Sequence, residues 1–105
     1  MCFGINEATG IIQLMKLPSN DNIYIDSHSN AVGSIWQKHR ESVVRIMKRC
    51  APECVFEIGG GGGFLEHTYN VADGSKTKKW IILEPQPNPI NTSAEYIQGF
   101  FPFLI

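Results

Sequence analysis

The sequence predicts an α/β protein built around a parallel sheet, and three observations lead to that prediction. Short apolar runs alternate with helical patterns between residues 32 and 99. Five consecutive glycines, Gly59 to Gly63, join the first of these runs to the next helical pattern. A strand, a helix and a second strand joined by short connections are typical of a parallel βαβ unit, whose crossover is right-handed almost without exception.

The charge balance of the chain is nearly neutral, with nine Lys and Arg against ten Asp and Glu among 105 residues. Nucleic-acid binding requires a surplus of basic residues, so we expect no nucleic-acid partner. The apolar share of 43% predicts a folded chain. Its apolar runs are far shorter than the roughly 20 residues of a bilayer helix, so we expect no membrane segment.

The three cysteines, Cys2, Cys50 and Cys54, are an odd set without the spacing of a disulfide framework. Reduced thiols of this kind favour a cytoplasmic location. Pro52 lies between Cys50 and Cys54, so these two cannot share one helix face. We therefore expect two buried thiols rather than a pair of metal ligands, and no metal site.

The first 31 residues are predicted to form an amino-terminal extension ahead of a second unit over residues 32–105. Within the extension, Gly10 to Met15 is an apolar run that predicts a short strand. The polar stretch from Pro18 to Asn22 follows, and it predicts a turn because these residue types preset or tolerate turn dihedrals.

A long amino-terminal helix is predicted over Val32–Cys50, ahead of the sheet. Asn30 or Ser29 can cap its start, and Pro52 ends it. Apolar residues recur at steps of three and four, which predicts one buried stripe with Trp36 as a core anchor. The stripe consists of Val32, Ile35, Trp36, Val43, Ile46, Met47 and Cys50, with His39 packed beside it.

Three strands and one further helix are predicted after this helix. Cys54–Ile58 reads as a strand buried on both faces, and a helix follows from Phe64 to about Val71. Lys79–Glu84 is a second buried strand with Trp80 as a core residue. A proline-rich loop then leads to a third strand over Ala94–Gly99.

The glycine run lies where a strand turns into a helix, which is the first turn of a nucleotide-binding βαβ unit. Glycine permits the positive φ angles of a tight turn, and the missing Cβ lets a ligand approach the backbone. Dinucleotide sites prefer G-x-G-x-x-G, but the sixth position here is Phe64, which disfavours that ligand class. A flexible linker is the alternative reading, although linkers are usually flanked by polar residues.

Val55–Gly63 resembles motif I of class I S-adenosylmethionine-dependent methyltransferases, in which an acid stands two residues before G-x-G-x-G. Glu57 takes the acidic position in this comparison. Trp80–Pro85 is similar to the second strand of that family, which ends in an acid, here Glu84. The resemblance implies a Rossmann-like cofactor-binding half-domain over residues 32–105.

Two upstream segments resemble the sugar C-methyltransferase-like branch of the same family. Tyr24–His39 is similar to the segment that precedes motif I, and Gly10–Leu14 to the end of a small zinc-binding module. Of the cysteines of that module this chain keeps at most Cys2, so we expect no zinc. The implied acceptor is a small molecule such as a nucleotide-linked sugar.

The resemblance also implies which residues bind S-adenosylmethionine. Glu84 would accept hydrogen bonds from both ribose hydroxyls, and Glu57 would lie near the methionine amino group. His28 is a weak candidate for a catalytic base, since a histidine before a helix is more often a cap or a surface residue. The expected cofactor-binding residues are Glu57, Gly59, Gly60, Gly61, Gly63, Glu84 and Pro85.

The resemblance covers only the amino-terminal half of the family's catalytic domain, which continues through further strands. We therefore expect self-association or a missing carboxy-terminal portion, and the apolar residues from Phe100 to Ile105 have no predicted cover. The alternative function is a truncated, non-catalytic Rossmann-like domain that binds a ligand or associates with itself.

Overall fold

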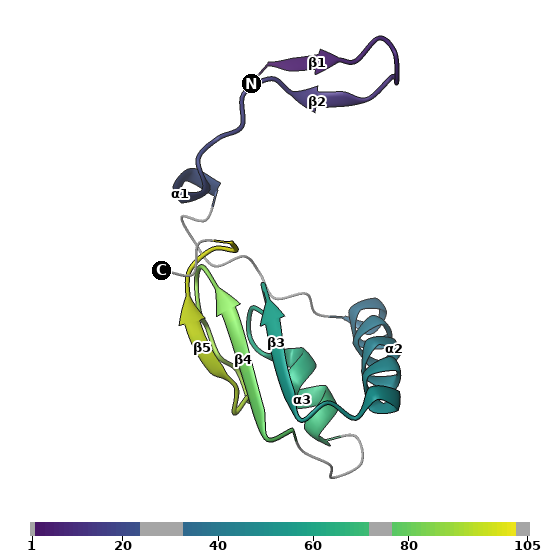
Figure 1. Cartoon of the computed structure of the whole chain (residues 1–105), viewed down its shortest axis with the longest axis vertical. Coiled ribbons are helices and arrows are strands. Elements are labelled where there is room, and N and C mark those ends of the chain that lie inside the picture. Colours follow the sequence, from purple (N-terminus) through teal and green to yellow (C-terminus); the bar gives the residue numbers. More distant parts are fainter. Residues whose placement is uncertain (1, 24–32, 72–76, 103–105) are drawn as a thin grey trace.

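The computed structural model describes residues 2–23, 33–71 and 77–102 of the chain. It is an α/β structure with a three-stranded parallel sheet and two helices packed on that sheet (Figure 1). In chain order, the elements are β1 (Phe3–Ile5), β2 (Ile12–Leu14), α1 (Asn20–Ile23), α2 (Ser34–Cys50), β3 (Cys54–Ile58), α3 (Phe64–Val71), β4 (Lys79–Glu84) and β5 (Glu95–Gln98).

The parallel sheet has the strand order β3-β4-β5, as the alternating pattern of the sequence predicts. Glu57 is aligned with Ile82, and Ile82 with Tyr96, so these three residues lie on the same face. α3 connects β3 to β4 as the crossover of a βαβ unit. The bounds predicted for β3, α3 and β4 are confirmed, and β5 lies within the predicted third strand.

The amino terminus itself is not helical: it forms two short antiparallel strands, followed by the short α1. The helix predicted over Val32–Cys50 is present as α2, which begins two residues later, at Ser34, and ends at Cys50. β2 was predicted, whereas β1 was not. The hairpin turn is closed by Asn6, whose Oδ1 accepts the Ala8 amide at 3.0 Å, and whose carbonyl accepts the Gly10 amide at 2.7 Å. Figure 1 shows this hairpin apart from the parallel sheet.

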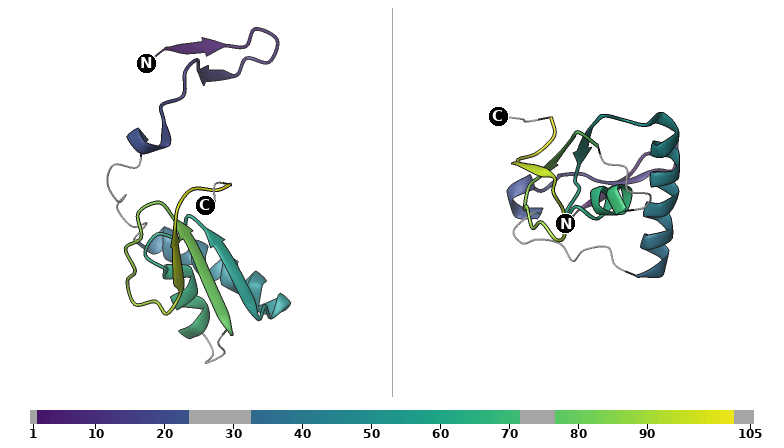
Figure 2. Two further views of the ribbon diagram at one scale, coloured as in Figure 1. Left: turned by 60° about the vertical axis from the view of Figure 1, so that its left-hand side comes forward. Right: turned by 90° about the horizontal axis from the view of Figure 1, so that it is seen from below.

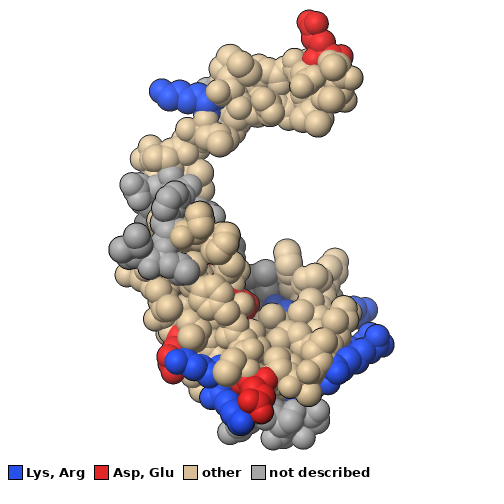
Figure 3. All heavy atoms as spheres, viewed as in Figure 1, with Lys and Arg blue, Asp and Glu red and all other residues tan. Residues whose placement is uncertain are grey.

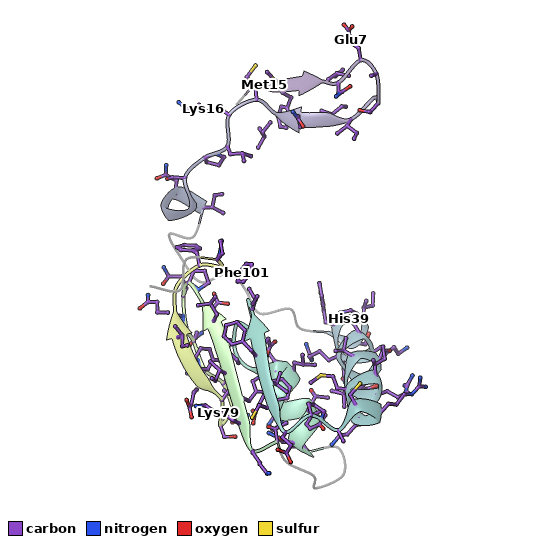
Figure 4. The ribbon with its side chains drawn as sticks, in the orientation of Figure 1. Glu7, Met15, Lys16, His39, Lys79 and Phe101 are labelled. Carbon is purple, nitrogen blue, oxygen red and sulfur yellow. The ribbon has the colours of Figure 1, made fainter. Side chains whose placement is uncertain are left out.

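The helix α2 buries only part of the predicted stripe. Val44 is its buried residue, while Trp36 is half exposed and Ile35 is 80% exposed. His39, labelled in Figure 4, is exposed as well. The stripe prediction is wrong for Ile35, Trp36, Ile46 and Cys50, which are exposed, whereas Val43 and Met47 are half-buried and Met47 packs against the core. α2 packs mainly against the eight-residue α3, which covers only a short length of it.

The ends of α2 are fixed by backbone groups. Gly33 is its N-cap, so no side-chain hydrogen bond caps this end of the helix. The predicted caps, Asn30 and Ser29, lie outside the described residues. At the other end Ala51 adopts a left-handed conformation with φ of 44°, and its amide donates to the Met47 carbonyl at 3.0 Å.

The hydrophobic core lies between the two helices and one face of the sheet. It joins Val44 of α2 and Tyr69 of α3 to Trp80 and Ile82 of β4. The rings of Tyr69 and Trp80 are 5.8 Å apart between centroids. Trp80 is therefore the core residue that the sequence predicts.

Both helices lie on the same side of the sheet (Figure 2). On the opposite face Phe56, Ile58 and Ile97 are 48%, 52% and 43% exposed. The prediction that β3 is buried on both faces is therefore wrong. The central strand β4, which was also predicted to be buried, has buried residues on both faces, Ile82 on one and Leu83 on the other. In the described part of the chain, the outer edge of β3 pairs with no other strand.

The surface of the described residues carries mixed charge. On the face drawn in Figure 3, acidic and basic side chains alternate around the lower end of the sheet. Lys78 pairs with Glu53 at 3.0 Å and Lys79 with Glu95 at 3.7 Å. No described helix is long and apolar enough to cross a membrane.

The thiols of Cys2, Cys50 and Cys54 are free and belong to exposed residues, so the expectation that Cys50 and Cys54 are buried is wrong. Cys50 is the last residue of α2 and Cys54 the first of β3, so both lie at the ends of their elements and outside the core. Among the described residues, no group of three His, Cys, Asp or Glu side chains is placed to hold a metal ion.

Candidate functional site

The glycine run forms an ordered turn between β3 and α3 at the carboxyl end of the sheet. Gly59, Gly61 and Gly63 have φ of 73°, 53° and 81°, which is the conformation that the sequence predicts for these positions. The Gly59 amide donates to the Leu83 carbonyl at 2.8 Å, and the Gly63 amide to the Gly60 carbonyl at 3.0 Å. These bonds exclude the flexible-linker reading.

Gly60 and Gly63 lack room for any side chain. A Cβ at Gly60 would lie 2.7 Å from Cγ2 of Ile82 and 2.7 Å from the carboxyl carbon of Glu57. A Cβ at Gly63 would lie 2.6 Å from the side chain of Thr92. The turn therefore rests directly on β4 and on the loop that follows it.

The Glu84 carboxylate lies against this turn. Its Oε2 accepts the Gly61 amide at 3.0 Å, and its Oε1 accepts the Gln86 amide at 3.2 Å. A carboxylate offers about four acceptor sites, so each oxygen keeps about one lone pair for a further donor. The two amides fix the direction of the carboxylate and leave it able to bind a diol.

The Glu57 carboxylate reaches the turn from β3. Its Oε2 accepts the indole N–H of Trp80 at 2.9 Å, and its carboxyl group lies beside Gly60. Burial raises the pKa of Glu57, the Trp80 hydrogen bond opposes that shift, and the charges of Glu66 and Glu84 add to it. A cationic ligand group beside Glu57 would relieve this burial of negative charge.

The glycine turn thus brings together the two acids that the sequence singles out. Both extend from the same face of the sheet, because Glu57 aligns with Ile82, and Ile82 and Glu84 are two residues apart on one strand. The site therefore combines two carboxylate acceptors with the backbone of a glycine turn.

Pro85 follows Glu84 in the chain, and its carbonyl accepts the side-chain amide of Gln98 at 3.1 Å. Gln98 is aligned with Glu84 across β4 and β5. This bond fixes the start of the proline-rich loop. His28, the weak candidate for a base, lies outside the described residues.

No sequence pattern marks Glu66, a residue of α3 that anchors the proline-rich loop. Glu66 is only 2% exposed, and its carboxylate accepts the hydroxyls of Thr92 and Ser93 at 2.5 and 2.7 Å. The Ser93 amide and the Asn70 side chain donate to it as well. These hydrogen bonds outweigh the effect of burial, so the pKa of Glu66 is lowered.

The proline-rich loop also contacts the glycine turn directly. The Ile90 amide donates to the Gly62 carbonyl at 2.9 Å, and Thr92 stands against Gly63. An open hollow of about 400 Å³ lies between this loop and α3, lined by Glu66, His67, Asn70, Val71, Asn91, Thr92 and Ser93. Neither Glu57 nor Glu84 lines it, so it is separate from the site at the glycine turn.

Figure 4 marks the two ends of the sheet. Lys79 begins β4 at one end, and Phe101, which is exposed, lies beyond β5 near the carboxyl ends of the strands. The glycine turn and both candidate carboxylates belong to the end marked by Phe101. Ligands of open α/β sheets bind at the carboxyl ends of the strands.

Comparison of this chain with protein-family models, with curated proteins and with solved structures gives no match. The class that the fold and the site define is a small α/β protein with a glycine turn at the carboxyl end of a parallel sheet.

Proposed function

We propose that this chain is the cofactor-binding portion of an S-adenosylmethionine-dependent methyltransferase. One observation carries the proposal: the carboxylates of Glu57 and Glu84 converge on a single glycine turn between a parallel strand and a helix. Residue types, chain order and fold all agree with motif I of that family. The proposed acceptor is a small molecule such as a nucleotide-linked sugar.

The charge of the site favours an adenosyl sulfonium over a dinucleotide. Two carboxylates lie at the turn, and the charge of Glu84 contributes to the raised pKa of Glu57. A pyrophosphate brought to this turn would be repelled by both acids, whereas a sulfonium and an ammonium group would be attracted. Phe64, which starts α3 where a dinucleotide motif has its third glycine, supports the same choice.

Each residue has a defined part in this proposal. Glu84 accepts the ribose hydroxyls on its remaining lone pairs, and Glu57 faces the methionine ammonium. When bound, the cofactor supplies a methyl carbon that bonds to the acceptor as its bond to sulfur breaks, while the acceptor's proton passes to a base. No described residue is assigned as that base.

Titration calorimetry tests the proposal. We expect the chain to bind S-adenosylhomocysteine and to bind NAD at least about tenfold more weakly, a difference of about 1.4 kcal/mol. Equal affinity for the two ligands, or binding of NAD alone, would contradict it. Retained binding of S-adenosylhomocysteine by a Glu57→Gln, Glu84→Gln double variant would show that the ligand occupies another place.

A second candidate function is a non-catalytic Rossmann-like domain that binds a ligand or associates with itself. The exposed apolar residues Phe56, Ile58 and Ile97 on the open sheet face favour it. Binding of S-adenosylhomocysteine without methyl transfer to any acceptor, together with a dimeric mass in solution, would support this candidate over an enzyme.

A further inference from the structure

Tyr96 connects the strand β5 to the glycine turn. Its hydroxyl donates a hydrogen bond to the carbonyl of Gly61 at 2.9 Å, although the two residues are 35 positions apart. Tyr96 is aligned with Ile82 on the central strand, and its ring packs against the core. The side chain therefore crosses the sheet from its far edge to reach the turn above β3.

Gly61 is held on both sides by side chains from other strands. Its amide donates to Glu84 Oε2 at 3.0 Å, and its carbonyl accepts the Tyr96 hydroxyl at 2.9 Å. With φ of 53°, Gly61 has a backbone conformation that other residues adopt at a cost. A peptide in such a turn keeps its orientation only when its surroundings hold it.

The Tyr96 hydroxyl is protonated at neutral pH. Burial raises the pKa of Tyr96 to about 12, and the charges of Glu57, Glu84 and Glu66 add to the shift. A phenol in this state is a donor, and the Gly61 carbonyl is the acceptor that it has.

We propose that Tyr96 is a positioning residue for the adenosyl site, which acts through Gly61 to fix the ribose-binding carboxylate of Glu84. This inference rests on the proposed function. Tyr96 holds the Gly61 carbonyl, the Gly61 amide then holds Oε2 of Glu84, and the Gln86 amide holds Oε1. The carboxylate thereby presents its free lone pairs in a fixed direction, which reduces the ordering cost of binding a diol.

Replacement of Tyr96 by phenylalanine separates the hydroxyl from the ring. Tyr96→Phe keeps the ring in the core and removes only the donor to Gly61. Tyr69→Phe is the matched control, because Tyr69 is buried in the same core, with its ring against Trp80, and makes no described contact with the turn. The thermal stability of both variants is measured, so that an effect on the turn can be separated from a general loss of stability.

The first measurement needs no ligand. Amide hydrogen exchange by NMR is expected to be about tenfold faster at Gly61 in Tyr96→Phe, while the β4 amides of Ile82 and Leu83 keep their rates. Tyr69→Phe is expected to leave Gly61 unchanged relative to β4. Equal exchange of Gly61 in both variants would overturn the proposed role of Tyr96.

The second measurement is the affinity for S-adenosylhomocysteine. We expect Tyr96→Phe to weaken binding about fivefold and Tyr69→Phe by less than about twofold. In a Glu84→Gln background the effect of Tyr96→Phe should disappear, because the hydroxyl acts through that carboxylate. Fully additive effects in this cycle would overturn the inference, since a purely structural loss adds to any other.

The two measurements separate this inference from the proposed function. If the wild-type chain does not bind S-adenosylhomocysteine, the proposed function fails and the link from Tyr96 to a ribose fails with it. Faster exchange at Gly61 would in that case still establish that Tyr96 holds the turn. If the wild-type chain binds and Tyr96→Phe behaves as Tyr69→Phe does, only the inference about Tyr96 fails.

Discussion

The carboxylate of Glu84 and the backbone amide of Gly61 form a hydrogen bond of 3.0 Å between two residues 23 positions apart. This bond links the end of β4 to the glycine turn after β3, so the two halves of the βαβ unit are joined at the candidate site as well as through the sheet. The acid expected to bind a ribose is therefore already oriented by the turn that would meet the rest of the ligand.

Replacing Glu84 by glutamine should weaken binding of S-adenosylhomocysteine about tenfold, because hydrogen bonds to an ionised acceptor are roughly twice as strong as neutral ones. Glu95→Gln is the matched control: Glu95 is exposed, and its ion pair with Lys79 at 3.7 Å lies at the other end of the sheet. Calorimetry on both variants decides the matter. Equal losses would mean that overall charge, rather than this carboxylate, governs affinity.

Replacing Glu57 by glutamine should alter how stability depends on pH. The raised pKa means that the stabilising contribution of Glu57 is complete below its ordinary value of 4.5 and is lost as the pH rises through the raised pKa. Glu57→Gln cannot ionise, so its melting temperature relative to wild type should rise between about pH 4 and about pH 8. A constant difference across this range would show that the pKa of Glu57 is not raised.

Replacing Glu66 by glutamine should have the opposite dependence on pH. The lowered pKa means that its stabilisation is complete above the ordinary value of 4.5 and is lost as the pH falls through the lowered pKa. At neutral pH we expect a loss of about 2–4 kcal/mol in unfolding free energy, because hydrogen bonds to a buried carboxylate are broken or mispaired. The difference from wild type should shrink on acidification.

The control for Glu66 is Glu41→Gln on α2. Glu41 is exposed and accepts a hydrogen bond from Gln37 at 3.0 Å. Its replacement should change the unfolding free energy by less than about 0.5 kcal/mol at any pH. Denaturant titrations at several pH values give the unfolding free energy of the wild type and of both variants as a function of pH. An equal loss in both variants would mean that the contacts of Glu66 with Thr92 and Ser93 add no stability beyond that of an exposed carboxylate.

Replacing Gly63 by alanine should be much more damaging than replacing Gly59. Both residues have positive φ, 81° and 73°, so both variants carry the same backbone strain of about 1–3 kcal/mol. Only at position 63 does the new methyl group overlap another side chain, that of Thr92 at 2.6 Å, whereas nothing lies within 4 Å at Gly59. Overpacking should add about 1–3 kcal/mol at position 63.

Thermal unfolding of the two glycine variants is the measurement. Gly63→Ala is expected to melt several degrees below Gly59→Ala, since about 1 kcal/mol corresponds to roughly 4–8 °C in a domain of this size. A double variant of Gly63→Ala with Thr92→Ser should recover part of the loss. If the double variant melts no higher than Gly63→Ala, the loss does not come from overlap with the methyl group of Thr92.

Local patterns in the sequence predict the parallel unit well, because its strands and helix are contiguous and each is delimited by proline or glycine. Pro52 and Gly59 flank Cys54–Ile58, and Pro85 ends Lys79–Glu84; the structure confirms the limits of both strands. The two acids at the glycine turn follow from the period of a strand and from the parallel pairing, so their convergence is predictable too.

Features that depend on distant partners are not predictable in the same way. The periodicity of α2 indicates a helix but not which of its residues are buried. How much of α2 is covered by α3 depends on the tertiary structure, and Trp36 is half exposed for that reason. Glu66 meets Thr92 and Ser93 across 26 and 27 positions, and no local pattern marks such pairs. The contact of Tyr96 with Gly61 is of the same kind.

The close fit of the glycine turn against Ile82 and Thr92 has a genetic consequence. Glycine is the smallest residue, so every missense change at codon 60 or codon 63 adds a side chain. A saturation library scored for soluble protein should therefore show larger losses at codons 60 and 63 than at codon 59, where a new side chain meets open space and bears only the strain of the positive φ.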